Sequence, residues 1–244
     1  MSQETEKASW LATLKVAFPY TLPILAGFGF LGMAHGILMT KAGLGVFYSL
    51  GMAIVVFGGS LEYVAMELLL AAFAPGTAFL TALLVQARHL FYGIAMLDRY
   101  KGLGWKRFYL IFGMCDESFS INYTAQIPDD VDHGRFMFCV TLLDQLYWVT
   151  ANVIGGLLGG LITFDVEGLD FVMTAMFVVI FLEQWWKERR HGTALIGVGA
   201  SVVCLTIFGP DRFLLPTMAC ILALLTIFRK PIERSDAQKA GERA

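Results

Sequence analysis

Residues 46–73 read VFYSLGMAIVVFGGSLEYVAMELLLAAF, an apolar stretch that contains only two charged residues, Glu62 and Glu67. A helix needs about 20 mostly apolar residues to cross the hydrocarbon core of a bilayer, so this stretch is long enough to do so. Backbone polar groups inside lipid must be paired within their own segment, which makes such a segment helical. Residues 46–73 therefore predict a helical membrane protein.

Similar stretches follow one another along the whole chain, with short polar breaks between them. Only 16% of the residues are charged, whereas soluble domains carry about 25%. We predict an all-α, polytopic integral membrane protein with about seven or eight transmembrane helices, some of them broken or re-entrant. The candidate hydrophobic segments are Phe18–Met39, Val46–Phe73, Thr77–Leu97, Phe108–Ile127, Phe136–Phe164, Leu169–Trp186, Thr193–Phe208 and Phe213–Phe228.

Polarity divides the chain into a cytoplasmic N-terminal segment at 1–17, a transmembrane domain at 18–228 and a polar cytoplasmic tail at 229–244. This orientation places the basic tail and the loop at Lys187 in the cytoplasm, where Lys and Arg concentrate. The basic loop 99–107 conflicts with it, because three hydrophobic segments separate that loop from Lys187. Either one of those three segments is re-entrant or broken, or this loop violates the rule.

Several classes of protein are excluded by what the sequence lacks. The net charge of −2 offers no basic face for nucleic acid. The four cysteines lie in or beside apolar segments without a CxxC pair, which predicts neither a metal site nor disulfides. Phosphate-binding and metalloprotease motifs are missing from the sequence, so we expect no cofactor and no enzyme.

Ionisable residues inside the apolar segments are costly, and their presence favours a functional interpretation. Arg88 and Tyr92 are four residues apart and therefore share a helix face. Arg88 needs a carboxylate or carbonyl partner inside a membrane, and Asp116 and Glu117 are the nearest carboxylates in sequence. Three interpretations stay open: a structural ion pair between helices, a grip on an anionic group such as a substrate carboxylate, and gating or proton coupling.

The small residues Gly58, Gly59 and Ser60 precede Glu62 in the middle of a long apolar stretch. They permit either close helix packing or an unwound break, and transporters often bind their substrates at broken helices. Glu62 would suit a carboxyl group that takes up and releases a proton during each cycle. His89 could relay protons, although a hydrogen bond to a neighbouring helix explains it equally well.

Asp144, Tyr147 and Trp148 share one face of the segment 136–164, at positions i, i+3 and i+4. An aromatic wall beside a carboxylate could hold the amine and the side chain of an amino acid. The same pattern is also common where helices simply pack against each other.

The chain resembles the AzlC-type branched-chain amino acid permeases from about Phe18 to Phe228. The residues that carry the resemblance are Arg88-His89-Leu90-Phe91-Tyr92-Gly93, Asp116-Glu117-Ser118, Gly168-Leu169-Asp170-Phe171 and Leu182-Glu183-Gln184-Trp185. Two departures stand out, because the family usually has Asn where this chain has Gln86 and Gln where it has Glu62. The second departure adds an acid near the expected site, so substrate or ion coupling could differ.

The resemblance implies export of branched-chain, hydrophobic amino acids across the cytoplasmic (inner) membrane of a bacterium, driven by protons. It also implies a small AzlD-type membrane subunit as partner, and it leaves an oligomer possible. The alternatives are a passive channel and a membrane scaffold whose intramembrane ion pairs are structural. The candidate residues of the substrate and ion pathway are Glu62, Arg88, His89, Tyr92, Asp116, Glu117, Asp144 and Trp148.

Overall fold

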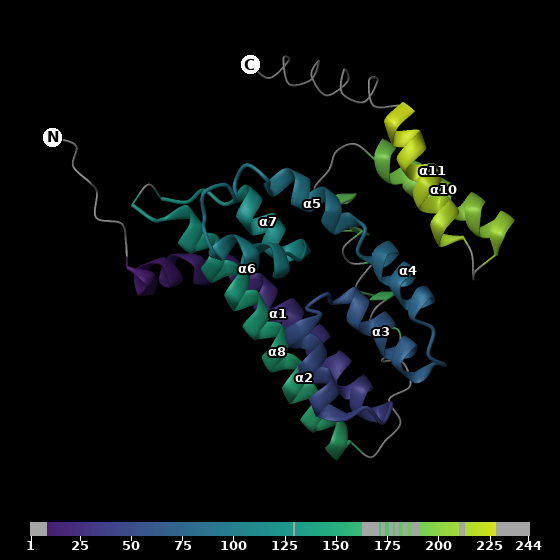
Figure 1. Ribbon diagram of the computed structural model, residues 1–244, viewed down its shortest axis with the longest axis horizontal. Coiled ribbons are helices and arrows are strands. Elements are labelled where there is room, and N and C mark those ends of the chain that lie inside the picture. The colour runs from purple at the N-terminus through teal and green to yellow at the C-terminus, as the bar shows by residue number, and fades with distance from the viewer. Residues whose placement is uncertain are drawn as a thin grey trace. The chain divides into compact units, whose positions relative to one another are not determined.

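The computed structural model describes residues 9–128, 130–162, 191–209 and 213–227, together with isolated residues between 171 and 186. The described residues form helices and contain no strand (Figure 1). The chain divides into two compact units, Met1–Ala175 and Met176–Ala244. The first unit contains α1 (Trp10–Lys41), α2 (Gly45–Val55), α3 (Ser60–Leu70), α4 (Pro75–Val85), α5 (Arg88–Met96), α6 (Lys106–Phe112), α7 (Asp116–Thr124) and α8 (His133–Leu161). The second contains α10 (Gly192–Phe208) and α11 (Leu214–Ile227).

Helices α1 and α8 are the two long helices of the first unit. Helix α1 begins at Trp10, where the Ser9 side chain accepts a hydrogen bond from the backbone amide of Ala12. It therefore starts within the segment expected to precede the membrane domain, ahead of Phe18. The Asp132 side chain caps α8 in the same way. With 32 and 29 residues, these helices extend about 48 and 44 Å, which exceeds the roughly 30 Å of a bilayer core.

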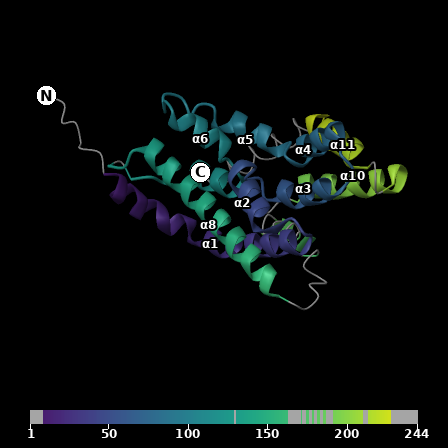
Figure 2. The same ribbon diagram turned by 60° about the horizontal axis from the view of Figure 1, so that its bottom comes forward.

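The two long helices lie side by side and run in the same direction (Figure 2). Near their N-termini, the rings of Trp10 and Phe138 meet edge to face with centroids 5.7 Å apart. Near their C-termini, the Thr40 hydroxyl donates to the carbonyl of Gly156 over 2.9 Å. If both helices cross the membrane, they cross it in the same sense, so the chain between them must return to the starting side.

Glycines bring the backbones of α1 and α8 into direct contact. A Cβ atom at Gly36 would collide with the backbone of α8, and one at Gly155 would collide with the carbonyl of Met33 on α1. Small residues at helix interfaces allow this close approach in membranes, where packing rather than water exclusion drives association.

The hydrophobic segment 46–73 forms two helices instead of one. Helix α2 ends at Val55 and α3 begins at Ser60. Phe57 and Gly59 between them have φ values of 42° and 41°, which lie in the left-handed region and stop a right-handed helix. The non-glycine residue in this conformation marks the break as a locally strained part of the chain.

The next two hydrophobic segments are also divided. The chain bends by 51° between α4 and α5, around residues 86–87. Helix α6 ends at Phe112 and α7 begins at Asp116. Each of the three segments between α1 and α8 therefore carries an interruption near its centre.

Helices α2 and α3 form a helical hairpin. Its two open ends lie at the end of the unit where α1 ends, and its tip, residues 56–59, points towards the middle of the unit. Val46, near the start of α2, packs against Gly156, whereas the carbonyl of Ile54 accepts a hydrogen bond from Gln145, earlier in α8. Helix α2 is therefore antiparallel to α8. In Figure 1, α3 then leads from the break back towards the end where α1 finishes, and α4 and α5 run in the opposite direction.

Helices α6 and α7 form a second helical hairpin. Its two open ends lie at the opposite end of the unit, where α1 begins. At the start of α6, the Lys106 ammonium lies 3.8 Å from the carboxylate of Asp132, just before α8. Just after α7, the carbonyl of Gln126 accepts a hydrogen bond from the Tyr20 hydroxyl in the N-terminal half of α1. The hairpin thus begins and ends near the N-terminal ends of the two long helices.

Among the described residues, α1 and α8 are long and apolar enough to cross a membrane, and the bent pair α4–α5 is a third candidate. The larger number of spans expected from the sequence stays a prediction. The expected segment 169–186 and the family motifs around Asp170 and Glu183 lie largely outside the described residues, as does the expected tail 229–244.

Candidate functional site

The three interruptions in the first unit lie next to one another. The Gln86 side chain, in the bend between α4 and α5, donates a hydrogen bond to the carbonyl of Gly58 over 3.1 Å. The ring of Phe57 lies against Gly113, at the turn between α6 and α7. The tips of the two hairpins and the bend of α4–α5 therefore meet in one region, where backbone groups lack regular helical partners.

Arg88, at the start of α5, connects the first turns of three helices. One terminal nitrogen of its guanidinium lies 2.7 Å from Oδ2 of Asp116, the first residue of α7. The other donates to the hydroxyl of Ser60, the first residue of α3, over 2.8 Å. The side chains of Arg88 and Asp116 are 33% and 25% exposed, and Arg88 Nε and Asp116 Oδ1 have no hydrogen-bond partner.

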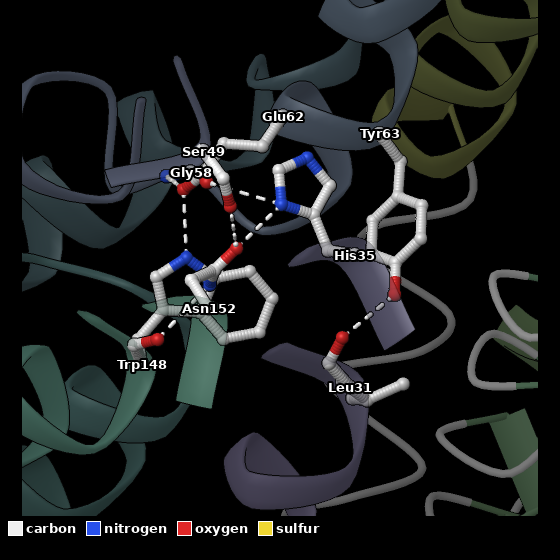
Figure 3. Close-up of polar contacts among 8 residues, drawn as sticks. All are labelled: Leu31, His35, Ser49, Gly58, Glu62, Tyr63, Trp148 and Asn152. Carbon is white, nitrogen blue, oxygen red and sulfur yellow. Dashed lines mark hydrogen bonds and ion pairs between the residues drawn. The ribbon is translucent and has the colours of Figure 1, made fainter. Parts of the chain in front are cut away.

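Glu62 lies two residues further along α3, in the same first turn, and is fully buried. Figure 3 shows its polar contacts. Its Oε1 accepts hydrogen bonds from the indole of Trp148, over 2.8 Å, and from the backbone amide of Gly58, over 3.1 Å. Within the described part of the chain its Oε2 has no hydrogen-bond partner, and this atom lies 4.0 Å from Nδ1 of His35 on α1. The Gly58 amide belongs to the interruption before α3, so the break itself supplies a donor to this carboxyl group.

His35, Ser49 and Asn152 complete the buried group around Glu62, and none of the three is among the residues predicted from the sequence. Nδ1 of His35 lies 2.6 Å from Oδ1 of Asn152, which also accepts a hydrogen bond from the Ser49 hydroxyl over 3.0 Å. All three side chains are fully buried. The available signal was the spacing of Asp144, Trp148 and Asn152, which places a polar face along α8 at i, i+4 and i+8.

Asp144 is fully buried on α8, and neither of its carboxylate oxygens has a hydrogen-bond partner among the residues that the structure describes. It interacts electrostatically with Glu117 in the first turn of α7. The hydroxyl of Tyr147, three residues further along the helix, forms a hydrogen bond with the Thr21 hydroxyl of α1 over 3.1 Å. A second acid on α7 therefore influences the buried carboxyl group of Asp144 on α8.

His89 and Tyr92 lie along α5 beyond Arg88. Nδ1 of His89 is 3.3 Å from the carbonyl of Gln86 in its own chain segment. The ring of Tyr92 stacks on Phe119 of α7, with centroids 4.4 Å apart. Tyr92 therefore holds α5 against α7, whereas His89 contacts the bend.

Helix ends shape the electrostatics of this region. Glu62, Asp116 and Glu117 all lie in the first turns of helices, where the positive end of the helix dipole favours acids. Arg88 occupies an unfavourable position at the start of α5, and Asp116 compensates its charge. The described residues contain no cluster of three or more side chains suited to a metal ion.

Residues 23–162 match the family described as AzlC protein. The branched-chain amino acid transport protein AzlC of Bacillus subtilis is 56% identical over 225 residues, which cover 92% of this chain and 89% of that protein. An uncharacterized membrane protein of Haemophilus influenzae is 42% identical, covering 93% of this chain and 94% of its own length. The inner membrane protein YgaZ of Escherichia coli is 24% identical, with coverages of 93% and 96%. No solved structure matches the chain.

These relatives are membrane and transport proteins, which confirms the predictions of an all-helical membrane protein and of a transporter rather than an enzyme. The family match covers both hairpins, α8 and the part of α1 from residue 23 onward. The alignments with the Bacillus subtilis and Haemophilus influenzae proteins extend over nine-tenths of this chain. The resemblance drawn from the motifs is confirmed, and the chain belongs to the AzlC family.

Proposed function

We propose that the protein is a secondary transporter that exports branched-chain amino acids across the cytoplasmic membrane of a bacterium, together with a small AzlD-type subunit. The name of the Bacillus subtilis relative supports the substrate class. The meeting of three interrupted helices beside buried ionisable side chains supports the transport mechanism, because transporters commonly bind substrates where helices are broken at the centre of the membrane.

The charges at the meeting point suit an amino acid. Arg88 Nε has no hydrogen-bond partner and could bind a carboxylate. Asp144, whose oxygens are also without partners, could bind an ammonium group. The ring of Phe57 lies between the hairpin tips and offers an apolar contact for a branched side chain. A guanidinium, a carboxylate and an apolar ring in one region would complement a zwitterion with a hydrophobic side chain.

We expect loaded cells that contain this protein and its partner to export leucine, isoleucine and valine with saturable rates. Efflux should fall when the proton gradient is collapsed, and it should need the partner subunit. Radiolabelled efflux, with methionine as a further substrate and cells lacking the protein as control, measures this. Unsaturable flux that ignores the gradient would favour the passive channel, and absence of any flux would favour the scaffold.

We further propose that the two hairpins are re-entrant and do not cross the membrane. Helices α2 and α3 have 11 residues each, and α6 and α7 have 7 and 9. Eleven residues extend only about 16 Å, which is half of a bilayer core. Each hairpin therefore reaches the centre from one side and returns. Helices α1, α4–α5 and α8 then cross the membrane in the first unit.

This arrangement removes the conflict over basic loops. If residues 108–127 do not cross, only the segments 136–164 and 169–186 separate the loop 99–107 from Lys187. Both basic regions then lie on the same side of the membrane. The loop 99–107 also lies at the end of the first unit where α1 begins, together with Arg135. The charges are consistent with a cytoplasmic location for all of them.

Cysteine labelling distinguishes re-entrant hairpins from simple crossings. In a variant without native cysteines, Ala72→Cys between α3 and α4 should react with an impermeant maleimide from outside the cell. Lys101→Cys should react only after the membrane is permeabilised. Simple crossings from a cytoplasmic N-terminus predict the reverse for both positions. Asp130→Cys serves as the control, because both arrangements place it in the cytoplasm.

A further inference from the structure

The hydrogen bonds around Asn152 fix the side on which His35 carries a hydrogen. The Nδ2 of Asn152 donates to the carbonyl of Trp148 over 2.9 Å, so the Oδ1 of Asn152 is the atom that faces Ser49 and His35. An amide oxygen can only accept, and His35 Nδ1 must therefore donate. Nε2, the other ring nitrogen of His35, is buried without a hydrogen-bond partner.

The hydrogen bonds to Glu62 make the same distinction between its two oxygens. Oε1 accepts from the indole of Trp148 and from the amide of Gly58, both of which can only donate. A proton bound to Glu62 therefore belongs on Oε2, the oxygen without a hydrogen-bond partner. In each residue, one side-chain atom, His35 Nδ1 or Glu62 Oε1, is hydrogen-bonded to the surrounding protein. The other, His35 Nε2 or Glu62 Oε2, has no hydrogen-bond partner among the described residues.

We propose that His35 and Glu62 form a site for one exchangeable proton, held on Glu62 Oε2 or on His35 Nε2, and that this proton couples to transport. The inference rests on the function proposed above. With one proton, the pair is electrically neutral in sum, either as carboxylic acid and imidazole or as carboxylate and imidazolium. Without the proton, a buried carboxylate remains that has no cationic partner in the described part of the chain, which is costly inside a membrane.

The charged and titratable groups around the pair come from four helices. Tyr63 of α3 meets His35 edge to face and donates its hydroxyl to the Leu31 carbonyl of α1. Asp144 lies one turn before Trp148 on α8, and Arg88 of α5 reaches Ser60. Tyr63 thus donates to a backbone carbonyl, and Arg88 pairs with Asp116. Among the described residues, no lysine or arginine forms an ion pair with Glu62.

A direct route connects this pair to the substrate position. Ser60 and Glu62 both belong to the first turn of α3, and Ser60 accepts a hydrogen bond from Arg88. Protonation of Glu62 and binding of a substrate carboxylate to Arg88 would therefore both act on the first turn of α3. Coupling between two sites requires such a shared element whose state both sites influence.

The test uses His35→Asn and Glu62→Gln in proteoliposomes that contain the transporter and its partner subunit. Asparagine at 35 can still donate to Asn152, and glutamine at 62 can still accept from Trp148, but each variant removes one of the two atoms that can hold the proton. We expect both variants to retain leucine counterflow, which needs no net proton movement. We expect them to lose leucine transport driven by a pH gradient, and to release or bind no proton when leucine is added, as read by a pH-sensitive dye.

Thr40→Val is the matched control, because it removes a hydrogen bond between α1 and α8 without altering the pair. It should keep the wild-type pH dependence. The inference is overturned if either variant keeps gradient-driven transport, or if both lose counterflow, since the pair would then belong to the substrate site or to assembly. Failure of the wild-type protein to transport leucine would instead refute the proposed function.

Discussion

Replacing Arg88 by lysine is expected to reduce transport by about two orders of magnitude, although the positive charge is retained. The two terminal nitrogens of the guanidinium reach Asp116 on α7 and Ser60 on α3. A lysine has a single ammonium nitrogen, which can approach one of these partners but cannot span both. The variant should therefore lose the connection between the two hairpins and the grip on a substrate carboxylate.

Initial rates of leucine efflux, normalised to the amount of protein in the membrane, measure this loss. Arg107→Lys is the matched control, because Arg107 is exposed in the first turn of α6 and should tolerate the change. Wild-type rates in the Arg88→Lys variant would show that charge alone suffices there. A loss of protein from the membrane, without a loss of rate per molecule, would assign Arg88 to structure instead of transport.

The positions of the interruptions could be predicted better than their geometry. Gly58, Gly59 and Ser60 mark a weak point in an apolar stretch, and helix α3 indeed begins at Ser60. The sequence does not say that the chain reverses there, because apolar segments have the same composition whether they cross or return. The reversal depends on contacts such as that between Phe57 and Gly113, which are far apart in the sequence.

The buried partners of Glu62 could not be predicted, for a related reason. His35 lies in a long helix whose composition is apolar on all sides, so no periodic pattern marks the face that it occupies. Its partner Asn152 is more than a hundred residues away. Only the parallel packing of α1 against α8 brings them together. By contrast, Arg88 and Asp116 stand out individually, since a charge inside an apolar segment demands a partner.

The arrangement of the first unit suggests how the site could be exposed to each side in turn. One hairpin enters from each end, and their tips meet beside the parallel pair α1 and α8. Under the proposed function, we expect movement of one hairpin against this pair to open the site to that hairpin's side of the membrane. The glycine-mediated contact of α1 with α8 would then serve as the fixed frame against which the hairpins move.

Replacing Gly155 by alanine is expected to have the largest effect on stability, because Gly155 lies at the contact between α1 and α8. In a helix, a change from glycine to alanine normally stabilises by about 1 kcal/mol. At Gly155 the added methyl group would collide with the Met33 carbonyl, which is backbone and cannot rotate away. Such overpacking costs about 1–3 kcal/mol, so the net effect should be destabilising, with α1 and α8 forced apart.

Gly160, in the same helix, is the matched control, because a methyl group added there meets no atom within 4 Å and should not destabilise the protein. Gly160→Ala should therefore leave the melting temperature of the detergent-solubilised protein unchanged or raise it, whereas Gly155→Ala should lower it and reduce the monodisperse fraction in size-exclusion chromatography. Equal melting temperatures for the two variants would mean that α1 and α8 do not pack through Gly155. In that case His35 would have no fixed position against Asn152, and the frame for both hairpins would be lost.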